Sequence, residues 1–218
     1  MISSLISQAA REEQMLTLDN LLVGREEKFH LAPLSLCILS GACIVLHGPN
    51  GSGKSTILKT LATLIQPQGG AILLGEVNIQ QDLDEYRSLL CYISDTETID
   101  PELSVIDNLL LWAEMASREP ALAATIMGMG LNEVVDEPVF TLSRGVRRRV
   151  QLARLLLSNA VIWLLDEPFV HLDEKTAEYL ANLIKMKCQN KGIVILSSHD
   201  ALVKLPDPAV IKLEDYRS

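Results

Sequence analysis

A glycine-rich segment in the first third of the chain has the residue types that bind phosphate groups. Residues 48–56 read GPNGSGKST and satisfy the pattern G-x-x-x-x-G-K-[ST]. The segment follows a short apolar run, CIVLH, and opens a stretch with helical spacing of apolar residues. This strand–loop–helix context is the one that the motif requires, and it argues against the alternative of a glycine-rich turn with no ligand. We therefore predict a phosphate-binding loop.

Each position of this loop has an expected contact. Glycine lets the backbone approach an anion closely, and N–H groups at the start of a helix then face the phosphates. The loop residues are Gly48, Pro49, Asn50, Gly51, Ser52 and Gly53. The ammonium of Lys54 would reach the β- and γ-phosphates, the hydroxyl of Ser55 would bind Mg²⁺, and Thr56 can contact the α-phosphate. The motif thus predicts a nucleoside triphosphate and Mg²⁺ as ligands.

Two acidic residues follow a strongly apolar segment further along the chain. The segment 161–168 reads VIWLLDEP, so Asp166 and Glu167 stand where a buried strand would end. Successive strand residues point to opposite sides, and α/β sheets bind ligands at the carboxyl ends of their strands. Asp166 suits Mg²⁺, and Glu167 suits a general base that polarises an attacking water. An acidic helix cap is the alternative, and the phosphate-binding loop upstream favours the catalytic interpretation.

Three consecutive arginines, Arg147, Arg148 and Arg149, raise the question of a nucleic-acid partner. They lie in LSRGVRRRVQLARLL, a segment that predicts a helix from Ser143 to about Ser158. Consecutive helical residues point about 100° apart, so the three cannot form one flat patch. The whole chain has a formal net charge of −9 and a pI of about 4.9, which repels a phosphate backbone. We expect no nucleic-acid partner.

The elements that must position these residues indicate an α/β fold. Apolar strands such as VIWLL and GIVIL alternate with helical segments, which is typical of a parallel sheet. Short apolar runs and turns between residues 16 and 46 predict strands and hairpins. Residues 83–140 change in character and predict a small helical insertion, with a capping pattern of Ser104 and Asp107 at one helix start. We divide the chain into a leader of unclear role, residues 1–15, and one domain, residues 16–218.

Cysteine use and hydropathy favour a protein of the cytosol. The four cysteines, Cys37, Cys43, Cys91 and Cys188, form no CxxC pair, and we expect them to be reduced core residues. The most membrane-like run, residues 31–46, is interrupted by Pro33, is shorter than a membrane span and is better explained as two buried strands. We expect neither a secretory signal nor a membrane anchor.

From about residue 16 to residue 215 the sequence resembles the ATP-binding subunits of ABC transporters. Five elements occur in that family's order: the phosphate-binding loop, then LSRGV, LLDEP, HLD and SSHD. The resemblance implies a P-loop NTPase of ABC type, with a parallel core sheet, an N-terminal antiparallel β region and a small helical subdomain. It also implies an ATPase that works as a homodimer, with two ATP molecules sandwiched head to tail, on an integral membrane transporter subunit.

The same resemblance assigns roles to further residues. Ser143 and Gly145 would contact the γ-phosphate of the ATP held by the other subunit, and Asp173 would meet the partner's phosphate-binding loop. His199 matches a histidine that holds the γ-phosphate, so that the implied catalytic residues are Glu167, His199 and Lys54. Arg149 and Arg154 match positions that are often arginine in the family, and we expect both to form structural ion pairs.

Several positions depart from the family pattern. The signature is usually LSGGQ, and here Arg144 and Val146 replace its third and fifth residues. In most members a glutamine senses Mg²⁺ and the membrane partner, and this position aligns with Thr96. The hydroxyl of Thr96 could also bind Mg²⁺, but the threonine side chain reaches less far than glutamine. The aromatic residue that usually stacks on adenine is missing from residues 23–25, where Phe29 could substitute only if the hairpin is shifted.

Within the family, several sequence segments resemble those of the ATP-binding export subunits of cytochrome c biogenesis, often called haem exporters. The matching segments are LSRGVRRRVQLARL, LDEPF and GIVILSSH. This implies a cytoplasmic protein, peripheral on the inner face of the cell inner membrane. Other hypotheses stay open: another small exporter or importer, an ABC-type ATPase acting on DNA or the ribosome, and a nucleotide-gated module that scarcely hydrolyses ATP. The second usually has a long coiled-coil insertion or two phosphate-binding loops, and neither is present.

Overall fold

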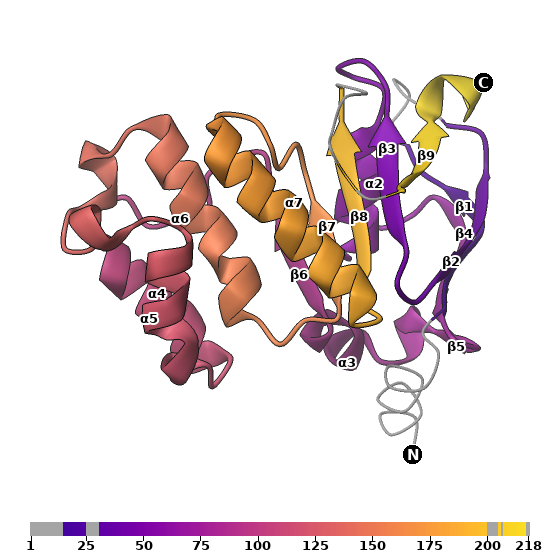
Figure 1. The fold of residues 1–218 in the computed structure, drawn as a ribbon. Coiled ribbons are helices and arrows are strands. Elements are labelled where there is room, and N and C mark those ends of the chain that lie inside the picture. The colour runs from indigo at the N-terminus through magenta and orange to yellow at the C-terminus, as the bar shows by residue number, and fades with distance from the viewer. Residues whose placement is uncertain (1–14, 25–30, 200–204, 206, 217–218) are drawn as a thin grey trace.

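The computed structural model describes residues 15–24, 31–199, 205 and 207–216, which form two sheets and a set of helices (Figure 1). The predicted leader lies outside the described residues apart from Met15, and Phe29 also lies outside them. Within the described ranges, no helix combines the length and the hydropathy that crossing a membrane requires.

The first sheet is antiparallel and has the strand order β2-β1-β4-β5. Its strands are β1 (Met15–Leu22), β2 (Leu34–Leu39), β4 (Gly69–Leu74) and β5 (Val77–Asn78). Alternate residues such as Leu16 and Leu18 are buried, as expected for a sheet with one face on the core. At Gly70 the backbone has φ +77°, and a Cβ there would lie 2.2 Å from the carbonyl oxygen of Asn20, so only glycine fits. The predicted N-terminal antiparallel region is thus confirmed.

The second sheet is parallel and has the order β6-β7-β8-β3-β9. Its strands are β3 (Cys43–His47), β6 (Leu90–Ile93), β7 (Ile162–Leu165), β8 (Ile193–Ser198) and β9 (Ala209–Lys212). Every residue of β7 and β8 is buried, which explains the apolar sequence of β7 and the apolar run IVIL that opens β8. Because the strands are parallel, the loops that follow β3, β6, β7 and β8 share one edge of the sheet. The predicted parallel α/β core is confirmed.

Helices cover both faces of the parallel sheet (Figure 1). They are α2 (Lys54–Leu61), α3 (Leu83–Ser88), α4 (Val105–Met115), α5 (Leu122–Gly128), α6 (Arg144–Leu157) and α7 (Glu174–Gln189). Short 3₁₀ turns occupy Ile79–Gln81, Glu119–Ala121, Asn132–Val134, Val139–Thr141 and Leu213–Tyr216. Ser104 caps α4 and Ser143 caps α6, each accepting a backbone N–H three residues on, as the sequence predicts.

Two apolar cores flank the parallel sheet. Helix α2 shares one core with the antiparallel sheet and with one face of the parallel sheet, through residues such as Ile57 and Leu58. Helices α6 and α7 cover the other face, and that core continues outward through Val150 to Leu109 of α4. Helices α4 and α5 therefore reach the sheet mainly through α6, while β6, which lies within residues 83–140, is part of the sheet itself.

The described cysteines are all free thiols, but they are not all in the core. Cys43 and Cys91 are buried, Cys188 is half-buried and Cys37 is exposed. The expectation of four core cysteines is wrong for Cys37, because alternation along β2 buries Ile38 and turns its neighbours outward.

Candidate functional site

The phosphate-binding loop joins β3 to α2 and has the backbone geometry that an anion cradle needs. Gly51 and Gly53 have φ values of +80° and +97°, a region that favours glycine, and Gly53 is the residue before the first turn of α2. A Cβ at Gly48 would lie 2.7 Å from Oγ of Ser52. Ser52 is itself buried, and its hydroxyl has no hydrogen-bond partner within the described residues. The close approach at Gly48 and the positive φ values at Gly51 and Gly53 therefore both favour glycine, and the loop presents its backbone.

Lys54 is held over this loop. Its Nζ donates to the carbonyl oxygen of Gly48 at 2.6 Å and to that of Pro49 at 3.2 Å. The same atom lies 3.6 Å from Oε1 of Glu167, and only 5% of the residue is exposed. The ammonium thus stands between the cradle and an acidic side chain from another strand end.

Asp166 and Glu167 follow β7 and share one partner, Ser197 of β8. The Ser197 hydroxyl donates to Oδ1 of Asp166 at 2.6 Å and accepts the backbone N–H of Glu167 at 2.8 Å. Asp166 is fully buried, and its Oδ2 has no hydrogen-bond partner within the described residues. Glu167 has φ +45°, so its carboxylate is presented from a strained backbone position. The sequence analysis did not single out Ser197, although it lies in the SSHD motif.

His199 completes the acidic cluster from the end of β8. Its Nδ1 lies 3.0 Å from Oε2 of Glu167, and more than half of the His199 side chain is exposed. The carboxylate of Glu167 is therefore flanked by Lys54 on one oxygen and by His199 on the other. The carboxyl edge of the sheet brings together side chains from three separate motifs.

The other predicted ligands of Mg²⁺ are placed differently from one another. Ser55 lies half-buried in the first turn of α2 beside Thr56, whose carbonyl oxygen accepts the hydroxyl of Thr60. Thr96 is exposed, its Oγ1 lies 2.8 Å from Oγ of Ser94, and its backbone is bound by the side chain of a helix α6 residue. Its hydroxyl is thus occupied by a neighbour rather than joined to the acidic cluster.

A second surface holds the remaining predicted site residues. Ser143 is exposed at the start of α6, and a Cβ at Gly145 would lie 2.9 Å from the carbonyl oxygen of His171. Asp173 is exposed and caps α7 by accepting the backbone N–H of Thr176 at 2.7 Å, a bond that lowers the pKa of its carboxyl. Within the described residues, no hydrogen bond or ion pair joins Ser143, Gly145 or Asp173 to the chain's own phosphate-binding loop.

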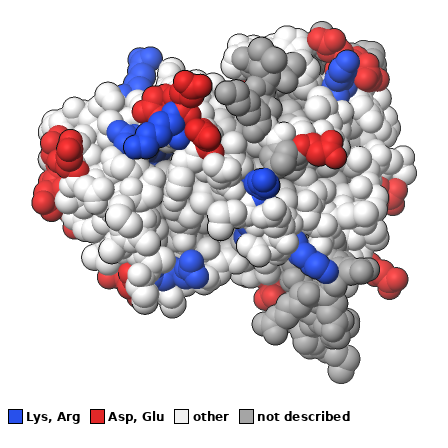
Figure 2. Space-filling model, viewed as in Figure 1, with Lys and Arg blue, Asp and Glu red and all other residues white. Residues whose placement is uncertain are grey.

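The arginines of α6 do not act as the sequence analysis expected. Arg149 donates to the backbone carbonyl oxygens of Met129 and Gly130, and Arg154 lies 5.9 Å from the centre of the Trp112 ring. Among the described residues, these contacts involve carbonyl oxygens and an aromatic ring rather than the ion pairs expected for both. The side chain that pairs with an acid is Arg147, whose Nε lies 3.0 Å from Oε1 of Glu97. On the face drawn in Figure 2, lysine and arginine side chains lie in small separate groups.

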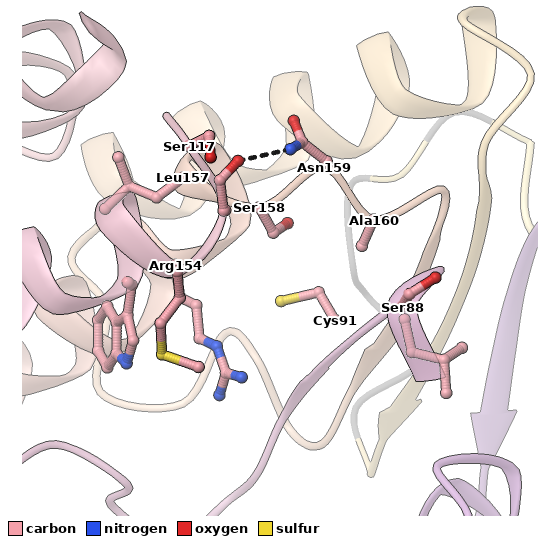
Figure 3. A pocket seen from close by; sticks show the side chains of 12 residues that line it. Ser88, Cys91, Ser117, Arg154, Leu157, Ser158, Asn159 and Ala160 are labelled. Carbon is pink, nitrogen blue, oxygen red and sulfur yellow. Dashed lines mark hydrogen bonds between the residues drawn. The ribbon is translucent and has the colours of Figure 1, made fainter. Parts of the chain in front are cut away.

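A pocket of about 390 Å³ lies away from this site, at the amino ends of β6 and β7 (Figure 3). Its lining includes Cys91, Arg154 and Ser158, and at its rim Asn159 donates to the carbonyl oxygen of Ala116 at 2.7 Å. The phosphate-binding loop follows the carboxyl end of β3, where ligands of α/β sheets bind. The pocket lies at the opposite edge of the sheet and is therefore separate from the loop.

The fold and this site define an ATPase with a phosphate-binding loop on a parallel sheet. A sequence model described as "ABC transporter" matches residues 31–170, and the chain belongs to this family. As a member, it is an ATP-binding, ATP-hydrolysing protein.

Curated relatives narrow the resemblance. The chain is 35% identical over 202 residues to the cytochrome c biogenesis ATP-binding export protein CcmA of Wolbachia pipientis, covering 93% of this chain and 98% of that protein. It is 35% identical over 205 residues to the CcmA of Vibrio cholerae, covering 92% and 99%.

Solved structures agree with this fold. An ABC transporter ATP-binding protein from Pyrococcus furiosus has a TM-score of 0.79 and 30% identity, covering 94% of this chain and 100% of that chain. A dimeric ATP-binding cassette bound to ADP and phosphate after hydrolysis has a TM-score of 0.75 and 26% identity, covering 86% and 89%.

Proposed function

We propose that the chain is the ATP-hydrolysing subunit of an exporter in cytochrome c biogenesis, the haem exporter, and drives a separate membrane subunit. The likeness to the CcmA proteins of two bacteria along nearly their whole lengths supports this placement. The observation that carries the catalytic part is the position of Glu167, whose carboxylate lies between Lys54 and His199 at the carboxyl edge of the sheet.

In this mechanism each side chain has one task. The ammonium of Lys54 stabilises negative charge on the β- and γ-phosphates, for which its place over the loop carbonyls suits it. Glu167 polarises the attacking water, and its carboxylate is held between Lys54 and His199. His199 orients the Glu167 carboxylate through its Nδ1 and reaches the γ-phosphate. Thus Lys54 binds the phosphates, His199 orients the carboxylate, and Glu167 accepts a proton from the water. No covalent intermediate is formed.

The acidic strand end also fits Mg²⁺. Oδ2 of Asp166 is buried and lacks a hydrogen-bond partner within the described residues, which leaves an acceptor for a bound ion or for its water. Mg²⁺ prefers oxygen ligands and keeps several waters, so Asp166 and the hydroxyl of Ser55 would hold it. When bound, Mg²⁺ would neutralise phosphate charge. The hydroxyl of Thr96 is the least suited of the three proposed ligands, because it is occupied by Ser94.

We further propose a homodimer in which each chain completes the other's ATP site. Among the described residues, Ser143 and Asp173 make local cap bonds and none of Ser143, Gly145 and Asp173 is bonded to its own phosphate-binding loop, which is compatible with a second chain bringing them to ATP. The start of α6 adds favourable helix-dipole charge for a phosphate. The dimeric arrangement of the cassette bound to ADP and phosphate supports this geometry.

The membrane subunit would hold this chain at the inner face of the inner membrane. Domain assignment follows the same proposal: residues 16–218 act as one ATPase domain, and the helices within residues 83–140 transmit closure of the dimer. Copurification from detergent tests the partner. We expect an integral membrane subunit and haem to accompany the chain, whereas a different cargo would point to another small exporter or importer.

Turnover of purified protein tests the catalytic proposal. We expect ATP hydrolysis by the wild type with Mg²⁺, none with a chelator, and at least a 100-fold slower rate for Glu167→Gln with ATP binding preserved. Equal rates for the wild type and Glu167→Gln would overturn the proposal. They would favour a nucleotide-gated module, a hypothesis motivated by Val146 in the signature and by Thr96.

A further inference from the structure

Two polar side chains of α6 are buried against the catalytic edge of the sheet. Arg148 is 7% exposed and Gln151 is 1% exposed, whereas the neighbouring Arg147 and Arg149 are half-buried. Their side chains are joined, because Nη1 of Arg148 donates to Oε1 of Gln151 at 2.9 Å. Buried polar groups need partners, and most of those of this pair are carbonyl oxygens of two loops, whereas Nε of Arg148 has no partner within the described residues.

Gln151 holds the loop that follows β6. Its Nε2 donates to the carbonyl oxygens of Ser94 at 3.2 Å and Thr96 at 2.8 Å, and lies 3.4 Å from Oγ1 of Thr98. Nη1 of Arg148 adds a bond of 2.6 Å to the carbonyl oxygen of Ser94. The backbone of residues 94–98 is thus fixed to α6 by side chains of that helix.

Arg148 also holds the backbone of the acidic strand end. Its Nη2 donates at 2.9 Å to the carbonyl oxygens of both Asp166 and Glu167. The N–H of Glu167 is bound from the other side by Ser197 of the sheet. The strained backbone of Glu167 is therefore fixed on its amide side by β8 and on its carbonyl side by α6.

The guanidinium group of arginine suits this position better than the ammonium group of lysine. The planar guanidinium presents donors in a fixed fork, so one side chain can bind the loop after β6 with Nη1 and the strand end after β7 with Nη2. Burial lowers the pKa of Arg148, and the nearby Asp166, Asp95 and Glu167 carboxylates oppose that effect and favour the charged form. A lysine would keep the charge but lack the fork.

We propose that Arg148 and Gln151 are positioning residues that set the main chain of Glu167 from α6, so that the general base is aimed correctly only while α6 is seated against the sheet. The inference rests on the proposed role of Glu167 in hydrolysis. Helix α6 is capped by Ser143 and carries Gly145 in its first turn. In this proposal it links these two signature residues mechanically to the catalytic carboxylate of Glu167.

Kinetics of purified variants test this link. We expect Arg148→Met to lower kcat by about 100-fold, the size of effect caused by a displacement of about 1 Å in a catalytic group, while the Kd of a fluorescent ATP analogue changes less than about threefold. Arg148→Lys should recover only part of the loss. Gln151→Met should lower kcat by about tenfold. Arg149→Met is the matched control, since it removes two arginine–carbonyl bonds from the same helix without touching the strand ends, and its kcat should stay near wild type.

A double-mutant comparison decides whether Arg148 acts through Glu167. In the Glu167→Gln background, Arg148→Met should cause no further loss of the residual rate, because the group that it positions is already absent. The inference would be overturned if Arg148→Met lowered kcat by the same factor in the Glu167→Gln background as in the wild type. It would also be overturned if Arg148→Met and Arg149→Met lowered kcat equally. Should Arg148→Met not fold, judged by its thermal melt, Gln151→Met in the two backgrounds makes the same decision. An inactive wild type, or full activity of Glu167→Gln, would instead remove the proposed function.

Discussion

The Nδ1 atom of His199 lies 3.0 Å from Oε2 of Glu167, and this contact joins the end of β8 to the end of β7. The two residues come from motifs that are separated by a helix and a strand in the sequence. Their meeting follows from the parallel pairing of β7 with β8, which aligns Leu165 with Leu196 and places both strand ends at one edge. The partly exposed imidazole of His199 therefore contacts the Glu167 carboxylate directly.

Replacing His199 with alanine should slow hydrolysis while leaving ATP binding largely intact. The substitution removes the partner that orients Glu167, and we expect kcat to fall by about 10- to 100-fold with a change in KM below about threefold. Steady-state ATPase assays over a range of ATP concentrations measure both constants. Unchanged turnover in His199→Ala would show that the contact has no role in catalysis.

Lys54→Met should act mainly on binding. The buried ammonium loses its charge, and a charge-assisted bond to phosphate contributes about 1.5–3 kcal/mol, so the Kd for ATP should rise by at least about tenfold. Isothermal titration calorimetry with ATP and Mg²⁺ gives this constant directly. Lys59→Met is the control, because Lys59 lies one turn and a half further along α2 and does not reach the loop carbonyls. Equal affinities for both variants would contradict the assignment.

Ser197→Ala should lower the free energy of unfolding by about 1–3 kcal/mol, since it leaves Oδ1 of Asp166 and the N–H of Glu167 buried without their partner. Urea titrations of the purified chain measure this change. Ser88→Ala serves for comparison, because Ser88 is exposed and its hydroxyl donates to the carbonyl oxygen of Glu85 in the same helix, so its effect should stay within about 0.5 kcal/mol. A Ser197→Ala variant as stable as the wild type would argue that another group satisfies the strand end.

Gly145→Ala should weaken ATP-driven dimerisation. The added Cβ would lie 2.9 Å from the carbonyl oxygen of His171, so either the start of α6 or the segment before Asp173 must shift. Both belong to the surface that we propose contacts the ATP of the other chain. Analytical ultracentrifugation in the Glu167→Gln background with ATP and Mg²⁺ should show about tenfold weaker association, since misfit contacts in packed sites cost about 1–3 kcal/mol. Arg144→Ala, an exposed neighbour in the same turn, should dimerise like the parent protein.

Much of this architecture is readable from local sequence. The apolar run before Asp166, the serine caps of α4 and α6, and the glycine-rich loop all depend on neighbours within a few residues, and those elements are confirmed. The family resemblance supplied the order of motifs and the expectation that they converge. The roles of Lys54, Glu167 and His199 stay predictions, which the geometry supports.

What sequence could not supply are contacts made across long separations. Nothing around Arg148 distinguishes it from Arg149, yet one is buried on the sheet while the other binds the carbonyl oxygens of Met129 and Gly130. Helical periodicity gives their relative directions but not the surface that each one meets, so it did not predict that, among the described residues, Arg149 binds carbonyl oxygens and Arg154 lies against Trp112. Ser197 was overlooked for the same reason, because its partners belong to another strand.

The strand order has a consequence for how the chain is made. Among the described strands, the neighbours of β3, which leads into the phosphate-binding loop, are β8 and β9, and these begin at Ile193 and Ala209. A nascent polypeptide leaves the ribosome amino end first, so the apolar segment CIVLH emerges long before either neighbour exists. Pairing over such a separation is slow, and until it occurs the unpaired segment is a natural target for chaperones. The loop synthesised first among the catalytic elements is therefore among the last to acquire its native support.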